Sequence, residues 1–468
     1  MKFLRLALLA ACAGALPLAA SAQGPVLSTF AVGPTTVTAS ALVSNLDVVW
    51  ELVWGPDNFL WATERYGRIS RINPATGQVL PLLTLPDVTA VGESGLLGMA
   101  LHPQFSTSPY VYVVYNYTDA GVLKEKVVRY TYSAAANTLS APAVLLANIT
   151  AFNTHSGSRL LILPDLTLLV STGDASQSSL AQNQAAVNGK ILRMNLDGTV
   201  PADNPTPNSL VYTSGHRNPQ GLVRLPNGRL YSSEHGPNND DEINKIEAGR
   251  NYGWPDVEGF CNLPAEAAFC TANNVREPLY TWTPTIAPSG LAYYDHPAIP
   301  GWRGSLLLAA LKGQQLLQLP LDAAGTAITS RADYLTGAFG RLRAICVSPD
   351  GKVYVGTSNL RGQLGGTPDP TDDRIIVLEN RSFVSAVRAG VASFAFEVFP
   401  NPAQGTATVQ LPALVARLTL QDVLGRPVRE FRPASATAVL DVSSLPAGTY
   451  WVQAEGPGGR ATRKLVVE

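Results

Sequence analysis

The feature that most constrains this chain is a short turn-and-strand unit that recurs along its first 380 residues. Each copy has a turn rich in Pro, Asp, Asn or Gly, followed by an apolar run of one strand's length. The turns of six such copies lie at residues 55–58, 102–105, 163–165, 225–228, 302–304 and 348–351. A second run often follows, at residues 67–72, 189–194, 315–319 and 374–378. Repeats of short strands and tight turns are typical of a β-propeller.

The repeat predicts an all-β chain with a six-bladed β-propeller over residues 23–385. A large β-sandwich is the alternative, but it would not explain why the units recur in the same phase. Charged residues make up 15% of the chain, which contains 40 Gly and 35 Pro, as suits a turn-rich β protein. The net charge of −1 gives no general attraction to nucleic acid or to an anionic membrane, so neither is expected as a partner.

The N-terminus has the anatomy of a removable signal peptide over residues 1–22. Lys2 and Arg5 precede an apolar run that is too short to span a bilayer, and small residues before Gln23 form a cleavage site. Cys12 lies in a stretch that resembles a lipoprotein box, but the apolar run before it is short for that purpose. No other stretch predicts a transmembrane helix, so the mature chain is expected to be exported.

Export changes how the cysteines are interpreted. Cys261 and Cys270 enclose a short loop and could form a disulfide in an oxidising compartment; two unpaired thiols are the alternative. Cys346 lies in an apolar run and is expected to be a buried core thiol.

A composition break near residues 381–395 separates a second, smaller module at residues 386–468. Its runs of about seven short strands predict a small Ig-like β-sandwich. The module resembles the C-terminal sorting domain of the type IX (Por) secretion system in residues 400–402, 422–426, 445–450 and 464–467. That resemblance implies the type IX machinery as a partner and passage across the outer membrane, with the protein secreted or held at the cell surface. An adhesive or carbohydrate-binding module is the alternative.

Three of the five histidines lie in polar clusters next to strand edges, at residues 154–160, 215–221 and 234–242. His155 is a candidate general base because the usual pKa of histidine suits proton transfer near neutrality, and small neighbours would let a ligand approach. A structural histidine is equally compatible with the pattern.

Positive charge is concentrated in later segments. Arg341 and Arg343, two residues apart, share one face of a strand, and with Arg217 and Lys312 they would form an anion-selective pocket. Surface ion pairs are the alternative. Gly236 and Pro237 offer carbonyl oxygens in an acidic loop, a donor type that suits Ca²⁺, although an acidic turn without metal is the commoner case.

Residues from about 45 to 380 resemble the soluble pyrroloquinoline-quinone (PQQ)-dependent sugar dehydrogenases of the glucose/sorbosone dehydrogenase group. The matching stretches are residues 95–98, 102–105, 155–160, 189–193, 215–221, 234–237, 241–244, 251–255, 286–290, 311–313 and 341–343. The resemblance implies PQQ and Ca²⁺ as cofactors, an aldose sugar as substrate, a lactone as product and an external electron acceptor.

Carried onto this chain, the resemblance assigns a role to each candidate. Lys312, Arg341 and Arg343 would hold the acidic groups of PQQ. The resemblance also implies that Arg217 and Asn218 lie over the cofactor, that the carbonyls of Gly236 and Pro237 ligate Ca²⁺, and that His155 removes the proton from the anomeric hydroxyl.

Glu93 departs from the family pattern, because the glucose-oxidising members have Gln at this position beside the catalytic histidine. A carboxylate there would raise the basicity of a neighbouring histidine, but it also adds negative charge near an anionic cofactor. Two other functions remain open: a propeller hydrolase of the lactonase type, and a non-catalytic propeller that binds a glycan or protein.

Overall fold

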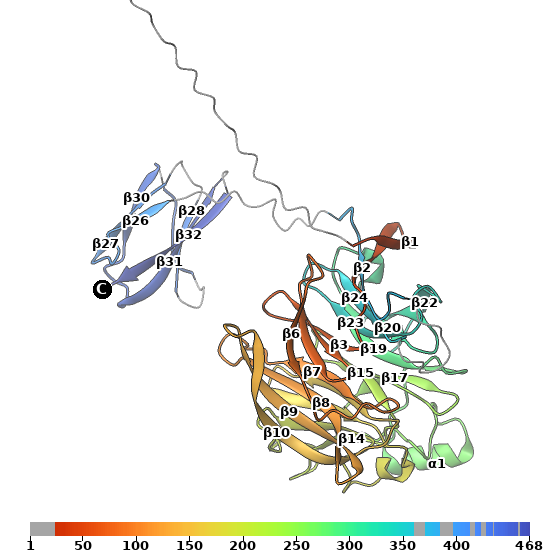
Figure 1. The fold of residues 1–468 in the computed structure, drawn as a ribbon. Helices are drawn as coiled ribbons and strands as arrows, with labels where there is room; N and C mark the ends of the chain where they lie inside the picture. The colour runs from red at the N-terminus through yellow and green to blue at the C-terminus, as the bar shows by residue number, and fades with distance from the viewer. Residues whose placement is uncertain are drawn as a thin grey trace, which may run out of the picture. The chain divides into compact units, whose positions relative to one another are not determined.

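The computed structural model describes residues 24–359, 370–383, 396–411, 417–422, 427–433, 435–456 and 459–468. The predicted signal peptide, with Cys12, and the predicted boundary between residues 385 and 386 lie outside these ranges. The chain divides into two compact units, Met1–Phe383 and Val384–Glu468, which are described separately (Figure 1).

Six antiparallel sheets form the larger unit, which confirms the predicted six-bladed propeller (Figure 1). The first strands of the sheets contact one another in a closed ring: β3 (Val49–Trp54), β7 (Leu96–Leu101), β11 (Gly157–Ile162), β15 (Pro219–Arg224), β19 (Pro288–Tyr294) and β23 (Leu342–Val347). The second strands are β4 (Leu60–Glu64), β8 (Tyr110–Asp119), β12 (Thr167–Thr172), β16 (Leu230–Glu234), β20 (Ser305–Ala310) and β24 (Val353–Thr357). All six predicted turns join a first strand to a second strand, so the sequence repeat has the phase of the blades.

The outer strands complete each sheet. The third strands are β5 (Arg68–Ile72), β9 (Val122–Ser133), β13 (Lys190–Asn195), β17 (Asp241–Ile246), β21 (Gln315–Pro320) and β25 (Ile375–Glu379). Five sheets end in β6 (Val79–Thr84), β10 (Thr138–Thr150), β14 (Val211–Ser214), β18 (Tyr280–Trp282) and β22 (Ala332–Tyr334). The sixth sheet ends instead in two N-terminal strands, β2 (Thr35–Val43) and β1 (Val26–Val32). Thr38 of β2 pairs with Glu379 of β25, so this sheet closes the ring.

Neighbouring blades pack face to face, which explains the apolar runs in the repeat. All six residues of β12 and all six of β20 are buried, as expected for strands covered on both faces. Near the ring centre the first strands approach so closely that glycine is required. A Cβ on Gly98 would lie 2.1 Å from the carbonyl oxygen of Ser158, and one on Gly290 would lie 2.5 Å from that of Arg343.

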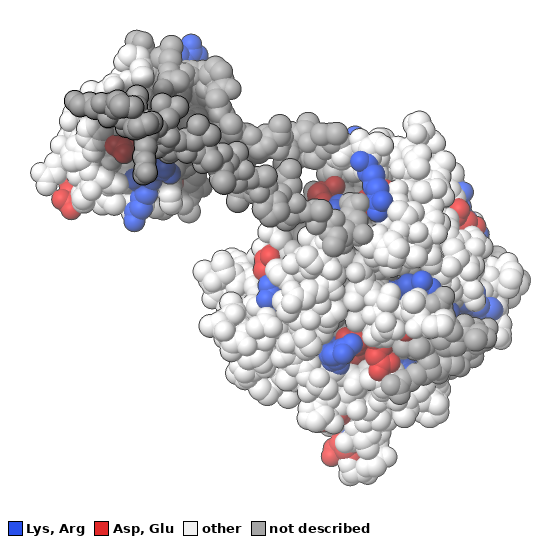
Figure 2. Space-filling model, turned by 45° about the horizontal axis from the view of Figure 1, so that its top comes forward, with Lys and Arg blue, Asp and Glu red and all other residues white. Residues whose placement is uncertain are grey.

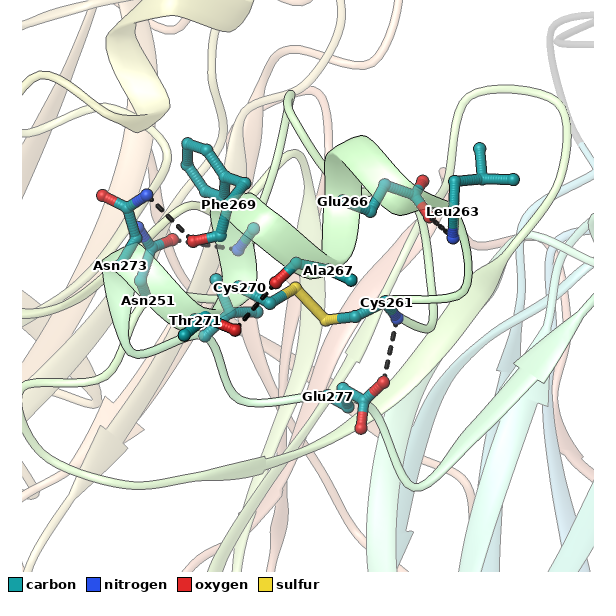
Figure 3. Close-up of a disulfide and its surroundings, with 12 residues drawn as sticks. Asn251, Cys261, Leu263, Glu266, Ala267, Phe269, Cys270, Thr271, Asn273 and Glu277 are labelled. Atoms are coloured by element: carbon teal, nitrogen blue, oxygen red, sulfur yellow. Dashed lines mark hydrogen bonds between the residues drawn. A yellow bond between two sulfur atoms is a disulfide. The ribbon is translucent and has the colours of Figure 1, made fainter.

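The connection between β17 and β18 carries the helix α1 (Pro264–Asn273), and short 3-10 turns lie at Ser178–Ala181 and Pro300–Trp302. Glu266 accepts a hydrogen bond from the Leu263 amide at the start of α1 (Figure 3). Cys261 and Cys270 form a disulfide beside this helix (Figure 3). Cys346 is a buried free thiol, as expected.

The smaller unit contains two antiparallel sheets around one apolar core, as the predicted sandwich requires. One sheet has β26 (Glu397–Phe399), β27 (Thr406–Gln410) and β30 (Thr437–Asp441), and the other has β29 (Pro427–Phe431), β28 (Arg417–Gln421), β31 (Gly448–Gly456) and β32 (Gly459–Val467). Residues 423–426 of the sorting motif fall outside the described ranges.

The surface reflects the near-zero net charge. On the face drawn in Figure 2, Lys and Arg side chains lie scattered among Asp and Glu on a mostly uncharged surface. Within the described residues, none of the helices has both the length and the apolar character needed to cross a membrane.

Candidate functional site

Antiparallel pairing places the start of a first strand and the end of a second strand at the same edge of a blade. The nine predicted site residues all lie at or next to such positions. Glu93, His155, Arg217, Asn218, Arg341 and Arg343 lie just before or at the start of first strands, whereas Gly236, Pro237 and Lys312 follow second strands. The blade geometry therefore brings all nine to one end of the ring.

His155 is held by a carboxylate that the sequence analysis did not single out. Its Nδ1 lies 2.7 Å from Oδ1 of Asp174, which follows β12 and whose side chain is almost fully buried. Oδ2 of Asp174 accepts a hydrogen bond from Nε1 of Trp254 at 2.8 Å. An Asp partner at Nδ1 favours the tautomer whose Nε2 is free to accept a proton. The geometry thus suits His155 to general-base chemistry.

Glu93 contacts the main chain of His155, not its ring. Oε2 of Glu93 accepts a hydrogen bond from the His155 amide at 3.0 Å. Burial alone would raise the pKa of the Glu93 carboxyl, but the hydrogen bond from the His155 amide and the nearby Arg343 charge lower it. Glu93 is thus an anion that positions the His155 backbone.

Arg217 and Asn218 are fixed through Glu234 and the neighbouring loops. Oε1 of Glu234 accepts hydrogen bonds from both of their amides. Nη1 of Arg217 donates to the carbonyl of His235 at 3.2 Å, and its guanidinium lies over the Trp254 ring, 5.4 Å from the centroid. Burial lowers the pKa of Arg217.

Arg343 and Arg341 form a like-charged pair at the ring centre. Arg343 is buried, and burial together with Arg341 lowers its pKa to about 9. Its Nη1 donates to Oε1 of Gln220 at 3.1 Å, and its guanidinium lies 5.6 Å from the centroid of the Trp50 ring. Lys312 is exposed and donates to Oγ1 of Thr285 at 2.7 Å. Burial raises the pKa of the nearby Asp241 to about 6, against the opposing effects of the Ala287, Gly236 and Ile286 amides and of Lys312.

Several nitrogens at this end of the ring are buried and have no hydrogen-bond partner among the described residues, and four of them belong to the clusters described above. They are Nε of Arg217, Nδ2 of Asn218, Nε of Arg341 and Nε2 of His235. Burial, followed by Arg217 and Arg343, lowers the pKa of His235 to about 3 against the opposing effect of Glu93, so its ring is neutral. Buried polar atoms are nearly always paired, so this group marks a place for a polar ligand.

Gly236 and Pro237 border a small, partly open cavity, which Arg217, Trp254 and Glu242 also line. Burial and the nearby Glu234 raise the pKa of Glu242 well above its usual value. The Gly236 amide donates to Oδ1 of Asp241 at 2.9 Å, which fixes the loop. Carbonyl and carboxylate oxygens next to a cavity are suitable ligands for a hard cation.

With this geometry in place, the comparisons with known proteins decide the family. Residues 46–365 match the sequence profile described as Glucose / Sorbosone dehydrogenase. The chain belongs to the glucose/sorbosone dehydrogenase family. Quinoprotein glucose dehydrogenase B of Acinetobacter calcoaceticus is 34% identical in an alignment that covers 69% of this chain and 85% of that protein. Aldose sugar dehydrogenase of Escherichia coli is 30% identical, covering 71% and 92%.

Solved structures of the family have the same fold. The PQQ-bound form of aldose sugar dehydrogenase from Streptomyces coelicolor superposes with a TM-score of 0.64 at 34% identity, and the match covers 74% of this chain and 99% of that one. Residues 397–468 match the secretion system C-terminal sorting domain, which implies secretion through the type IX system. Both resemblances stated from the sequence are thereby confirmed.

Asp174, Trp254, Gln220 and His235 are site residues that the sequence analysis did not assign to roles. Asp174 follows the second strand of its blade, at a position equivalent to Lys312 in another blade. The phase of the repeat is the signal that could have identified it. Trp254 lies in the long connection between β17 and β18, whose path the repeat does not specify.

Proposed function

We propose that this chain is an exported PQQ- and Ca²⁺-dependent aldose dehydrogenase that oxidises the anomeric hydroxyl of a sugar to a lactone. The observation that supports it best is the juxtaposition of a carboxylate-held histidine and a group of unpaired donors. His155 lies against Asp174, while Arg217, Asn218 and Arg341 have buried nitrogens without partners among the described residues.

The donor set fits a tricarboxylated quinone. Arg341 and Arg343 are adjacent cations, and the Nε of Arg341 is buried without a hydrogen-bond partner in the described part of the chain, so bound carboxylates would relieve their repulsion. Lys312, which is exposed and donates to Thr285, would add a third positive charge. Gly236 and Pro237 would ligate Ca²⁺ with their carbonyl oxygens. When bound, PQQ supplies the hydride acceptor and Ca²⁺ polarises its quinone.

This chain's own residues would orient the sugar and move one proton. Asp174 keeps the proton of His155 on Nδ1, so that Nε2 can take the proton of the anomeric hydroxyl. Asp174 also stabilises the imidazolium that results. Arg217, whose guanidinium lies over the Trp254 ring, would donate hydrogen bonds above the site. Glu93 accepts the His155 amide and so fixes the backbone from which the imidazole projects.

Adding PQQ and Ca²⁺ to the apo-protein and following dye reduction with a panel of aldoses tests this proposal. Sugar-dependent reduction that requires both cofactors is expected. If PQQ binds but no aldose is oxidised, the protein is a binding propeller with a degenerate site, and the enzymatic proposal is wrong.

A lactonase-type hydrolase is supported less well. It would need acidic metal ligands from several blades, and no group of three or more His, Cys, Asp or Glu side chains in the described part of the chain has such an arrangement. It would also have no use for Arg341 and Arg343. Lactone hydrolysis assayed in the same preparation would identify it.

For the C-terminal module, we propose that type IX export releases the propeller outside the outer membrane or tethers it to the cell surface. Fractionation of the native host, with antibody to the propeller, distinguishes the two.

A further inference from the structure

A buried carboxyl that the proposed chemistry does not use lies below the loops of Glu93 and His155. Glu125 is on β9 and is only 2% exposed. Its Oε2 accepts hydrogen bonds from Oγ of Ser158 at 2.8 Å and from Nδ2 of Asn116 at 3.2 Å. Its Oε1 is buried and has no donor among the described residues. Burial of a carboxyl group reduces the free energy of folding unless hydrogen bonds compensate for the lost hydration, so its two partners matter.

The two partners of Glu125 lead to the two site loops. Oδ1 of Asn116 accepts a hydrogen bond from the Gly95 amide at 3.0 Å, and the Asn116 amide donates to the Gly95 carbonyl at 2.9 Å. Gly95 is two residues after Glu93, at the end of the same loop. Ser158 is three residues after His155. One carboxyl therefore connects the segment that carries Glu93 with the turn that carries His155.

That turn has a backbone that needs external support. His155 has φ of 57° and Ser158 has φ of 70°, both in the left-handed region that side chains other than Gly disfavour. Such residues cost on the order of 1–3 kcal/mol each and persist only where surrounding contacts hold them. Side chains from several strands hold this turn, among them Glu93 at the His155 amide, Asn218 at the Gly157 amide, and Glu125 at Ser158.

Glu125 is surrounded by uncharged groups. Asn116 on β8 and Ile149 on β10 are its cross-strand neighbours, and Ser158 faces it from β11. Burial raises the pKa of Glu125 to about 8, and the hydrogen bonds from Ser158 and Asn116 only partly oppose that rise. Oδ1 of Asn116 accepts the Gly95 amide, so its Nδ2 donates to Oε2 of Glu125, and the carboxyl proton is placed on Oε1, where glutamine would have its amide group.

We propose that Glu125 is a positioning residue that holds the His155 turn in register with the Glu93 loop, and that it does so as a neutral acid. The catalytic part of this proposal rests on the proposed dehydrogenase function. Glutamine can replace a neutral acid at this position because its carbonyl oxygen accepts the same two hydrogen bonds. Leucine cannot, and it would leave Ser158 and Asn116 without their acceptor.

Hydrogen exchange of the apo-protein tests the structural part without any cofactor. In Glu125→Leu, the amides of residues 155–158 should exchange faster by roughly tenfold or more, whereas Glu125→Gln should match the wild type. Asn204→Ala removes another buried hydrogen-bonding side chain, which serves a different loop, and should leave residues 155–158 unchanged. Should Glu125→Leu not fold, Asn116→Leu removes the other hydrogen bond to Glu125 and tests the same connection from the Glu93 side. Unchanged exchange at 155–158 in both variants would overturn the proposal.

The melting temperature as a function of pH tests the neutral acid. Glu125 keeps its proton in the folded state up to about pH 8 but loses it near pH 4.5 when unfolded. The wild type is therefore destabilised progressively as pH rises from about 4.5 to about 8. Glu125→Gln has no proton to lose and so lacks this pH-dependent destabilisation. It should melt near the wild-type temperature at pH 5, and several degrees above the wild type at pH 8. A constant difference across this range would contradict a protonated Glu125.

Enzyme kinetics test the role of Glu125 and the proposed dehydrogenase function together. With PQQ, Ca²⁺ and an aldose, Glu125→Leu should lower kcat more than it raises KM, and Glu125→Gln should restore kcat and extend activity to higher pH. A Glu125→Gln variant as slow as Glu125→Leu would overturn the neutral-acid role. If no variant oxidises any sugar, the dehydrogenase function fails, while the exchange and melting results still decide whether Glu125 positions the turn.

Discussion

The two sides of the site are built in opposite ways. On the His155 side, the ring and amide contact Asp174 and Glu93, and Asp174 also receives the Trp254 indole. On the cationic side, Arg217, Asn218 and Arg341 each have a buried nitrogen without a partner among the described residues. The difference supports the proposal that the protein itself completes the group that would transfer the proton and leaves the group that would bind an anion to be completed by a ligand.

Replacing His155 removes the proposed general base and should have the largest effect on turnover. A positioned general base contributes roughly 10²–10⁴-fold to rate, so kcat of His155→Ala in the reconstituted enzyme should fall by about that factor. PQQ affinity should change little, because the cationic side is left intact. Steady-state kinetics and a PQQ titration measure the two quantities.

His296→Ala is the matched control for that experiment. His296 lies in a turn, where it hydrogen-bonds the Ala298 amide, and its loss should leave kcat unchanged. Unaltered turnover in His155→Ala would mean that another group accepts the proton.

Replacing Arg341 tests the incomplete side. A charge-assisted hydrogen bond contributes about 1.5–3 kcal/mol, so the Kd for PQQ of Arg341→Gln should rise roughly 10–100-fold. The apo-protein should be as stable as the wild type or more stable, because the change removes repulsion with Arg343. Isothermal titration and thermal melting give both results.

Arg303→Gln is the corresponding control, since Arg303 forms an exposed ion pair with Asp295. It should alter neither PQQ affinity nor turnover. A loss of apo stability in Arg341→Gln without a change in PQQ affinity would show that this arginine serves the fold.

Glu93→Gln tests both sides of the site at once. Glu93 holds the His155 amide on one side, and its negative charge acts on Arg343 on the other. The amide oxygen of the glutamine can still accept the His155 amide, so the turn should remain in place. Partly exposed charge pairs typically contribute up to ~1 kcal/mol, so PQQ should bind roughly two- to fivefold tighter once the negative charge is removed. Glu247→Gln provides a control outside the site, and weaker PQQ binding in Glu93→Gln would contradict this electrostatic role.

The propeller could be predicted because its sequence signal is local and repeated. A tight turn and a strand buried on both faces leave the same pattern in every blade, and the phase of that pattern places the site at one edge. Polar clusters around His155, Arg217 and Gly236 could be recognised for the same reason: they interrupt apolar runs at that edge.

The residues that were missed depend on packing between distant segments. Asp174 is a single acidic residue after a strand, where acidic residues are common, and its contact with Trp254 spans two blades. Glu125 lies between Lys124 and Lys126, so the sequence suggests an exposed charged strand. Alternation along β9 instead turns the two lysines outward and Glu125 inward. Such a pattern cannot reveal which face the neighbouring blade covers.

Closure of the ring by β2 and β25 also means that the propeller cannot be completed until almost all of its strands have been synthesised. Thr38 reaches its partner Glu379 only after nearly the whole propeller has emerged from the ribosome or the inner-membrane channel. The entropic cost of closing a loop grows only logarithmically with its length, so the long separation between β2 and β25 adds little to the free energy of folding. It does make this pairing slow, because it is the most distant in the sequence of this unit. A chain cut short before β25 would lack its closing strand. The sorting module follows that strand, so any chain that displays the export signal already carries the segment needed to close the ring.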